Sequence, residues 1–199
     1  MRLKRRVLRP LGRRLLRRTT ILILQAPCSE LRYDVPVGVR LIRVSQRSTA
    51  REIQLVNEAM RCAGEPDGLV TPRLAQGDEC FGWLLGDKIV TFGWITYRNR
   101  QVGPLRLLDA PGRVFSFNAH TLEPFRGRGL YTALLRARLD FLGRESVAEL
   151  IIDVRADNRA SLRAIEKAGF CRVGELTYVT LCSRWRCALR CVTSHAGLI

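Results

Sequence analysis

Residues 123–132 read Glu-Pro-Phe-Arg-Gly-Arg-Gly-Leu-Tyr-Thr, and this stretch decides the fold. It joins an alternating strand pattern over residues 113–122 to an amphipathic helix pattern over residues 130–142. Gly127 and Gly129 allow a tight turn, and the first turn of the new helix has backbone amides without intrahelical acceptors. With the positive end of the helix dipole, these amides suit a phosphate or pyrophosphate group.

The side chains of the loop support the same anion site. Arg126 and Arg128 add fixed positive charge, and the Thr132 hydroxyl is placed to donate from the first helical turn. A Gly-rich loop alone is a weak signal, because an exposed turn that arginines keep soluble has the same composition. The elements that follow the loop therefore distinguish an anion site from a simple exposed turn.

A second strand and helix follow the first pair. The apolar run 148–154 predicts a buried strand. Asp157 or Asn158 then caps a helix that ends at Gly169-Phe170. The order is strand, Gly loop, helix, strand, capped helix and Gly-Phe, and this order makes the case for a specific fold.

At this point the chain resembles the GCN5-related N-acetyltransferase (GNAT) family, whose members transfer acyl groups from acetyl-CoA. The family's pyrophosphate loop has the form Arg/Gln-x-x-Gly-x-Gly/Ala, and a tyrosine replaces the last small residue here. The matching positions are Arg126, Gly127, Arg128, Gly129, Leu130 and Tyr131. The second signature matches at Asn158, Ser161, Gly169 and Phe170. The resemblance covers about residues 38–185.

The resemblance implies roles for these positions. The loop and the first helical residues, through Thr132, would hold the CoA pyrophosphate. The strand that ends at Leu122 would pair with the pantetheine arm. Asn158 would contact pantetheine, and Ser161 would lie near the thioester sulfur. Many members also carry a tyrosine that protonates the departing thiolate, but this chain has Ile165 at that position. A free thiol has a pKa of roughly 8.5, so a hydrogen bond to sulfur suffices for this leaving group.

The acceptor side is less defined by the sequence. Acetyl transfer to an amine requires a base that takes the amine's proton. Simple alternation along the strand 113–122 places Ser116, Asn118 and His120 on one face. His120 is the first candidate base and Glu123 the second. A hydrogen-bonded strand histidine and a surface glutamate are the alternative interpretation.

The net charge of the 199-residue chain is +16, and nine of its basic residues lie within residues 1–18, which contain no acid. This leader alternates basic and apolar residues, a pattern that suits an anionic membrane surface as a partner and equally a solvated arm. RNA is a less favoured partner. No stretch is long enough to span a bilayer.

The chain has seven cysteines without a Cys-x-x-Cys pair. This pattern predicts a reducing compartment, the cytoplasm, with a peripheral position at the inner face of a membrane if the leader binds lipid. Cys182, Cys187, Cys191 and His195 are too loosely spaced for a zinc site, so we expect thiols and no metal.

The sequence predicts an α/β protein with a central, mostly antiparallel mixed sheet flanked by helices. We expect a leader, short strand and linker over residues 1–36, an acetyltransferase domain over 37–186 and a C-terminal tail over 187–199 that frays beyond about residue 189. Ser48 is expected to cap a helix that runs to residue 62. A hairpin is expected to turn at Gly86-Asp87.

The predicted function is direct transfer of an acetyl, or another acyl, group from acetyl-CoA to an amine or hydroxyl. The acceptor itself does not follow from these residues. The alternative is a non-catalytic module that binds CoA, or that binds RNA through the leader.

Overall fold

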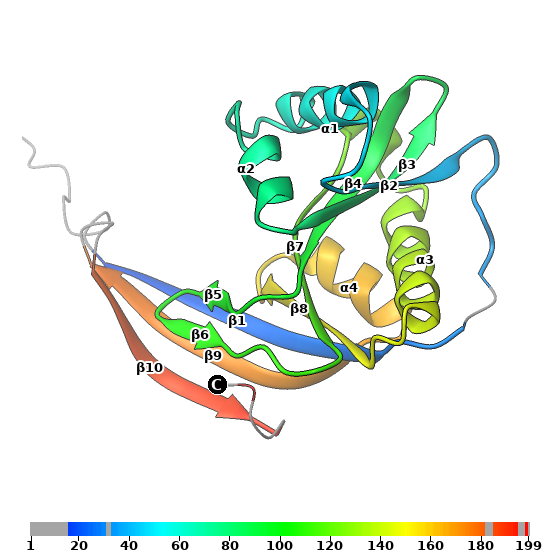
Figure 1. Cartoon of the computed structure of the whole chain (residues 1–199). Coiled ribbons are helices and arrows are strands. Elements are labelled where there is room, and N and C mark those ends of the chain that lie inside the picture. The colour runs from blue at the N-terminus through cyan, green and yellow to red at the C-terminus, as the bar shows by residue number, and fades with distance from the viewer. Residues whose placement is uncertain (1–15, 31–32, 182–184, 195–197, 199) are drawn as a thin grey trace, which may run out of the picture.

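The structure is a computed structural model that describes residues 16–30, 33–181, 185–194 and 198. In these ranges a large sheet separates two groups of helices (Figure 1). Most of the basic leader lies outside the described residues, so its contacts with lipid or RNA stay predictions. None of the helices in the described ranges is long and apolar enough to cross a bilayer.

The elements follow each other in mixed order. The strands are β1 Leu16–Pro27, β2 Arg40–Val44, β3 Glu79–Leu85, β4 Lys88–Thr96, β5 Arg100–Val102, β6 Leu105–Leu107, β7 Arg113–Thr121, β8 Glu149–Arg155, β9 Cys171–Leu181 and β10 Trp185–Thr193. The helices are α1 Ala50–Cys62, α2 Val70–Ala75, α3 Leu130–Arg144 and α4 Arg159–Lys167, with a 3₁₀ turn η2 at Glu123–Phe125.

Eight strands form the large sheet in the order β10-β9-β1-β8-β7-β4-β3-β2, and β5 pairs with β6 separately. Every pair in the large sheet is antiparallel except β7 with β8, which are parallel. The predicted fold class, a mostly antiparallel mixed sheet flanked by helices, is therefore confirmed. The hairpin β3-β4 turns where predicted, and Gly86 has a positive φ of 56° there.

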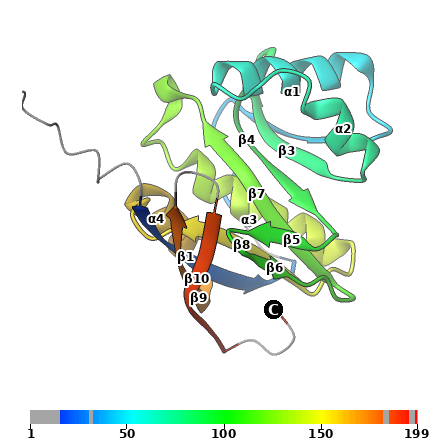
Figure 2. The ribbon, with the colours of Figure 1, turned by 90° about the vertical axis from the view of Figure 1, so that its left-hand side faces the viewer.

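Both ends of the described chain belong to the sheet. β1 was expected as a short strand ahead of the domain, but it lies between β8 and β9 and pairs with both. Residues 187–193 were expected to belong to a tail that frays beyond about residue 189, but they form most of β10 along the edge of β9. Figure 2 shows β1, β9 and β10 at the end of the sheet away from α1 and α2. The sheet thus extends beyond residues 37–186 on both sides.

The two faces of the sheet have separate cores. α1 and α2 cover β2, β3 and β4 on one face, where Trp94 and Phe92 are fully buried. α3 and α4 pack on the other face against β3, β4 and β8. The β5-β6 pair covers β1, β8 and β9 on the same face as α1 and α2. The residue that caps α1 is Thr49 rather than Ser48, because Thr49 and Glu52 form a reciprocal capping box.

A bulge in β7 opens the sheet. β7 pairs with β8 only from Arg113 to Ser116, and the register of β7 against β4 shifts between Phe92 and Trp94. Asn118 lies in this shift with φ of 46°, a left-handed conformation that asparagine tolerates better than most residues. A bulge bends its strand and adds twist. The end of β7 therefore leaves β8, and the candidate site lies at this separation.

Candidate functional site

The Gly loop connects β7 to α3 in an open conformation. Gly127 and Gly129 have φ of 76° and 74°, so both require the left-handed region. Gly129 is the N-cap of α3 and supplies no side-chain oxygen to the first turn. A Cβ added at either glycine would meet nothing within 4 Å. The loop thus combines uncapped first-turn amides with open space at both glycines, which suits an anionic ligand.

The two arginines of the loop are exposed. Arg126 donates from Nε to the Thr121 carbonyl oxygen at 3.1 Å, which holds the loop against the end of β7. The Arg128 guanidinium lies 5.4 Å from the centre of the Phe125 ring. Both cations stay available at the surface next to the α3 N-terminus.

Three loop residues have structural partners. The Leu122 amide donates to the Val90 carbonyl, and the Leu130 carbonyl accepts from Trp83 Nε1 at 3.0 Å. The Thr132 hydroxyl donates to the Ala164 carbonyl at 3.3 Å, which ties α3 to α4. Thr132 was expected to donate to the anion, but in this structure its hydroxyl holds the two helices together. Leu122 and Leu130 act through their backbone and are buried as side chains.

Tyr131 takes the position where the family motif has a small residue. Its side chain packs against the core under α3. Burial raises the pKa of Tyr131 to about 12, with a smaller rise from Asp153 and an opposing effect of Arg138. The hydroxyl therefore keeps its proton at neutral pH. Its position next to Leu130 places it at the start of α3, beside the separation of β7 and β8.

The second signature forms the start of α4. Asn158 caps this helix, and its Oδ1 accepts from the Ser161 amide at 3.2 Å. Asn158 is exposed and Ser161 is partly exposed, so both are accessible from the end of β8. Ile165 is buried. The residue before it, Ala164, accepts the hydrogen bond from the Thr132 hydroxyl through its carbonyl oxygen. α3 and α4 thus bring the Gly loop and the Asn158 cap to the same side of the sheet.

The bulge changes which β7 residues share a face. Asn118 and His120 were expected on one face with Ser116. In the structure Ser116 is buried toward α3 and accepts from Arg138 Nη1 at 2.8 Å. Asn118 and His120 point to the other face, toward the loop between α1 and α2. The left-handed Asn118 adds one residue to β7 and reverses the alternation, so the prediction for Ser116 is wrong.

His120 lies in a hydrogen-bonded cluster. Its Nε2 is 3.1 Å from Glu65 Oε1, and its ring stacks on Phe92 with centroids 5.6 Å apart. Asn118 Nδ2 donates to the same Glu65 oxygen at 2.8 Å, and Asn118 Oδ1 accepts from Arg73 Nη1 at 3.1 Å. The His120 side chain is about one-third exposed (34%). An imidazole held by a carboxylate and open to solvent is suited to accept a proton.

Sequence reasoning missed Glu65 and Arg73. Both lie between α1 and β3, in a segment whose Gly, Pro and Asp predict a mobile loop with one helical turn, and nothing in that pattern marks these two side chains. Glu123, the second candidate base, is exposed on η2, and its side chain has no hydrogen bond or ion pair with the described residues. The structure therefore brings His120 together with partners and leaves Glu123 at the surface.

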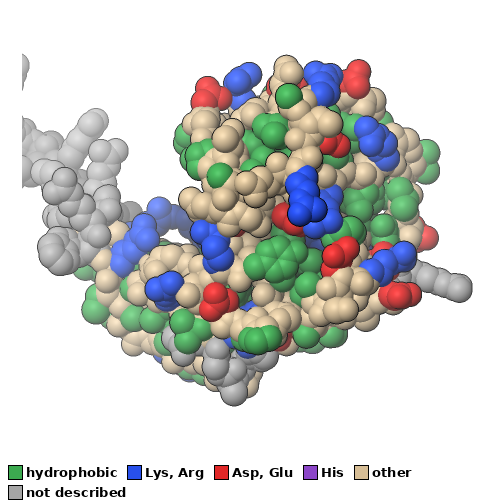
Figure 3. All heavy atoms as spheres, viewed as in Figure 1, with side chains coloured by type: hydrophobic (Ala, Val, Ile, Leu, Met, Phe, Trp, Pro, Cys, Tyr) green, Lys and Arg blue, Asp and Glu red, His purple; other side chains and the backbone are tan. Residues whose placement is uncertain are grey.

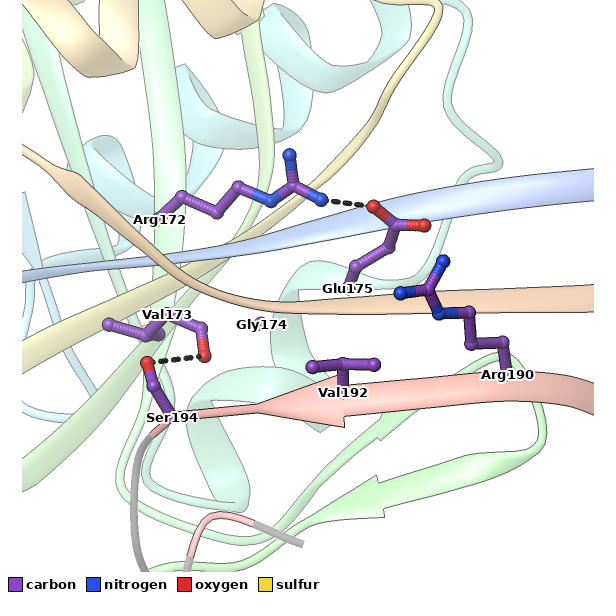
Figure 4. A pocket seen from close by; sticks show the side chains of 7 residues that line it. All are labelled: Arg172, Val173, Gly174, Glu175, Arg190, Val192 and Ser194. Carbon is purple, nitrogen blue, oxygen red and sulfur yellow. Dashed lines mark hydrogen bonds and ion pairs between the residues drawn. The ribbon is translucent and has the colours of Figure 1, made fainter.

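Two surface cavities lie away from this cluster. One, of about 300 Å³, borders the Gly loop and is lined by Arg128, Leu130, Phe125 and apolar residues of the segment before β2. The other, of about 310 Å³, lies between β9 and β10, where Arg172 pairs with Glu175 and Ser194 Oγ donates to the Val173 carbonyl at 3.2 Å (Figure 4). Figure 3 shows Lys and Arg side chains along the indentation between the α1-α2 part and the strands β1 and β9.

Comparison with known proteins agrees with this geometry. Residues 43–171 match the family model described as "Acetyltransferase (GNAT) domain". A mycothiol acetyltransferase of Corynebacterium glutamicum is 29% identical over 130 residues, which are 61% of this chain and 40% of that protein. N-alpha-acetyltransferase 30 of Schizosaccharomyces pombe is 33% identical over 55 residues, which are 28% of this chain and 37% of that protein.

Solved structures share the fold at low identity. A GCN5-related N-acetyltransferase from Sphaerobacter thermophilus has a TM-score of 0.61 and 16% identity, and the match covers 86% of this chain and 55% of that one. An acetyltransferase of the same family from Novosphingobium aromaticivorans has a TM-score of 0.57 and 17% identity, with coverage of 83% and 64%. This chain thus spans less than two thirds of each of these relatives.

Proposed function

Because this chain belongs to the GNAT acetyltransferase family, we propose that it transfers an acetyl group from acetyl-CoA directly to an amine. One observation carries the proposal. The Gly loop and the Asn158 cap lie on one side of a sheet that opens at Asn118, and the His120–Glu65 pair lies on the other side of that opening. Donor and acceptor groups would meet between β7 and β8.

The residues at the loop fit the donor. CoA carries a pyrophosphate, and the α3 N-terminus offers uncapped amides, open space at Gly127 and Gly129, and two exposed arginines. Asn158 and Ser161 are exposed or partly exposed at the start of α4, where they are available to the pantetheine arm. Tyr131 packs against the core under α3, and it departs from the family motif, as Ile165 does.

The acceptor side supplies a base. In the proposed reaction the neutral amine nitrogen attacks the thioester carbonyl carbon, a C–N bond forms and the C–S bond breaks. His120 takes the amine proton, and the sulfur leaves as the CoA thiolate. Glu65 Oε1 lies 3.1 Å from His120 Nε2 and holds the ring in place. Ser161 is the residue we place near the sulfur, because Ile165 has no proton to give.

The experiment is an assay of amine-dependent CoA release. The full chain is incubated with acetyl-CoA and a panel of amines, the free thiol is measured, and acetylated products are identified by mass. We expect thiol release that requires both an amine and the protein. Thiol release without amine dependence, together with intact acetyl-CoA binding, would instead identify a binding module without transferase activity.

Replacing Gly129 with Ala is expected to weaken acetyl-CoA binding about tenfold. A left-handed conformation costs a residue with a Cβ about 1–2 kcal/mol, and Gly129 has φ of 74° at the α3 N-cap. Gly77→Ala is the matched control, because Gly77 has φ of 83° and similarly open surroundings but lies after α2. Titration calorimetry of both variants checks this. Equal losses in the two variants would mean that the effect is general destabilisation.

A further inference from the structure

Two arginines from different elements contact the same aromatic ring at the separation of β7 and β8. Arg73 of α2 lies 5.3 Å from the centre of the Phe117 ring, and Arg100 of β5 lies 4.8 Å from it. Arg73 also lies 5.0 Å from the Trp94 ring. Phe117 directly follows Ser116, the last β7 residue that pairs with β8. Two cations are thus held at the point where the sheet opens.

The hydrogen-bond donors of these side chains are poorly matched by acceptors. Among the described residues Arg73 has no ion pair, and its Nη1 donates to the neutral side-chain amide of Asn118. Arg100 has one ion pair, in which Nε lies 3.3 Å from Asp153 Oδ1 without hydrogen-bond geometry. Trp94 Nε1 and Arg100 Nε are buried N–H groups without a hydrogen-bond acceptor among the described residues, and the partly buried Arg73 has no ion pair there. Buried N–H groups without partners are costly, so a ligand with acceptor oxygens is expected here.

The end of this cluster at Glu65 and His120 offers a carboxylate instead of cationic donors. Glu65 accepts from Asn118 Nδ2 and lies within hydrogen-bond distance of His120 Nε2. Asn118 connects the two ends, because its Oδ1 accepts from Arg73 and its Nδ2 donates to Glu65. One side of Asn118 therefore offers cationic donors and the other side offers a carboxylate with an imidazole. This separation of charge suits a molecule that carries both an anion and an amine.

We propose that the acceptor is an amine that also bears a carboxylate, such as an amino acid or a peptide with a free carboxyl group. This inference rests on the proposed function and names the class of its acceptor. The amine would lie at the His120–Glu65 end, and the carboxylate would lie between Arg73 and Arg100. A guanidinium matches the planar carboxylate with two parallel hydrogen bonds. Asp153 already offsets part of the Arg100 charge, which favours a singly charged carboxylate over a doubly charged phosphate.

The test compares matched acceptors in the acetyl-transfer assay. A series of amino acids is assayed against the same compounds as carboxamides, which keep the amine and lose the negative charge. We expect kcat/KM to be at least tenfold higher for the acids, since a hydrogen bond to a charged group contributes about 1.5–3 kcal/mol, a factor of ten or more. Arg100→Met should remove this preference and leave the rate with the carboxamides unchanged. Arg73→Met also loses the hydrogen bond to Asn118 Oδ1, so it should lower kcat/KM for the acids more than for the carboxamides.

Arg98→Met is the matched control, because Arg98 is near the cluster but its charge is paired with Asp78 at 2.8 Å. It should keep the preference for acids. Equal rates with acids and carboxamides, or an equal loss for both in the Arg73 and Arg100 variants, would overturn the inference and leave the proposed function standing. Thermal unfolding gives a second measurement that does not require turnover. Acids that fail to stabilise the wild-type protein more than carboxamides do would also contradict the inference.

Discussion

His120→Gln is expected to lower kcat for acetyl transfer about 10²–10⁴-fold, the usual contribution of a general base. Glutamine keeps a polar group near Glu65 Oε1, which lies 3.1 Å from His120 Nε2, but it does not take up a proton. The rise of kcat/KM with pH that an imidazole base produces should disappear in the variant. Steady-state kinetics as a function of pH measures both effects.

Glu65→Gln should lower kcat for acetyl transfer less than His120→Gln does, because Glu65 acts through His120. Glu58→Gln is the control for removing a carboxylate from the same region, since Glu58 is partly exposed on α1 and its Oε1 accepts a hydrogen bond from Gln54 Nε2. Acetyl-CoA binding should stay unchanged in all three variants. A wild-type rate and pH profile in His120→Gln, with the loss found in Glu123→Gln, would contradict the assignment of the base.

Gly93→Ala is expected to destabilise the fold by about 1–3 kcal/mol, the range for overpacked cores. A Cβ at Gly93 would lie 2.1 Å from Arg138 Nη2 and 3.0 Å from Ala119 Cβ. Arg138 is fully buried on α3 and donates to Ser116 Oγ, so its guanidinium has little room to move. Gly93 lies opposite the β7 bulge, and it leaves the space that this arginine fills.

A double-mutant cycle separates this contact from a general effect of alanine. Arg138→Met removes a buried cation whose Nε and Nη2 have no partner among the described residues, so this change alone is expected to cost little stability. In the Arg138→Met background, Gly93→Ala should cost less than half of its value in the wild type. Denaturant unfolding of the four proteins measures the coupling. Additive costs would show that the clash with Arg138 does not determine the effect.

The donor side could be predicted from the sequence because its signals are local. Gly127 and Gly129 are required by backbone conformation, and Asn158 caps α4 through the amide three residues later. Each of these depends on neighbours within a few residues. The hydrogen-bond acceptor of the Thr132 hydroxyl could not be predicted, because this acceptor, the Ala164 carbonyl, lies on another helix.

The acceptor side depends on long-range contacts. Simple alternation fails at Asn118, since the bulge appears only when β7 pairs with β4. Glu65 meets His120 across 55 positions of the chain, and no periodic pattern marks such a pair. The place of β1 inside the sheet could not be predicted either, because its two partners β8 and β9 lie more than 100 residues away in the sequence.

The central claim is that the Gly loop at the start of α3 binds acetyl-CoA, and thermal unfolding of the full chain tests it most directly. The unfolding temperature is measured with acetyl-CoA, free CoA and ATP at equal concentrations. A ligand at a hundred times its Kd adds about 2.7 kcal/mol to the free energy of unfolding. We expect a clear rise of the unfolding temperature with both CoA species and none with ATP. No rise with either CoA species, or an equal rise with ATP, would mean that the loop is only a basic turn.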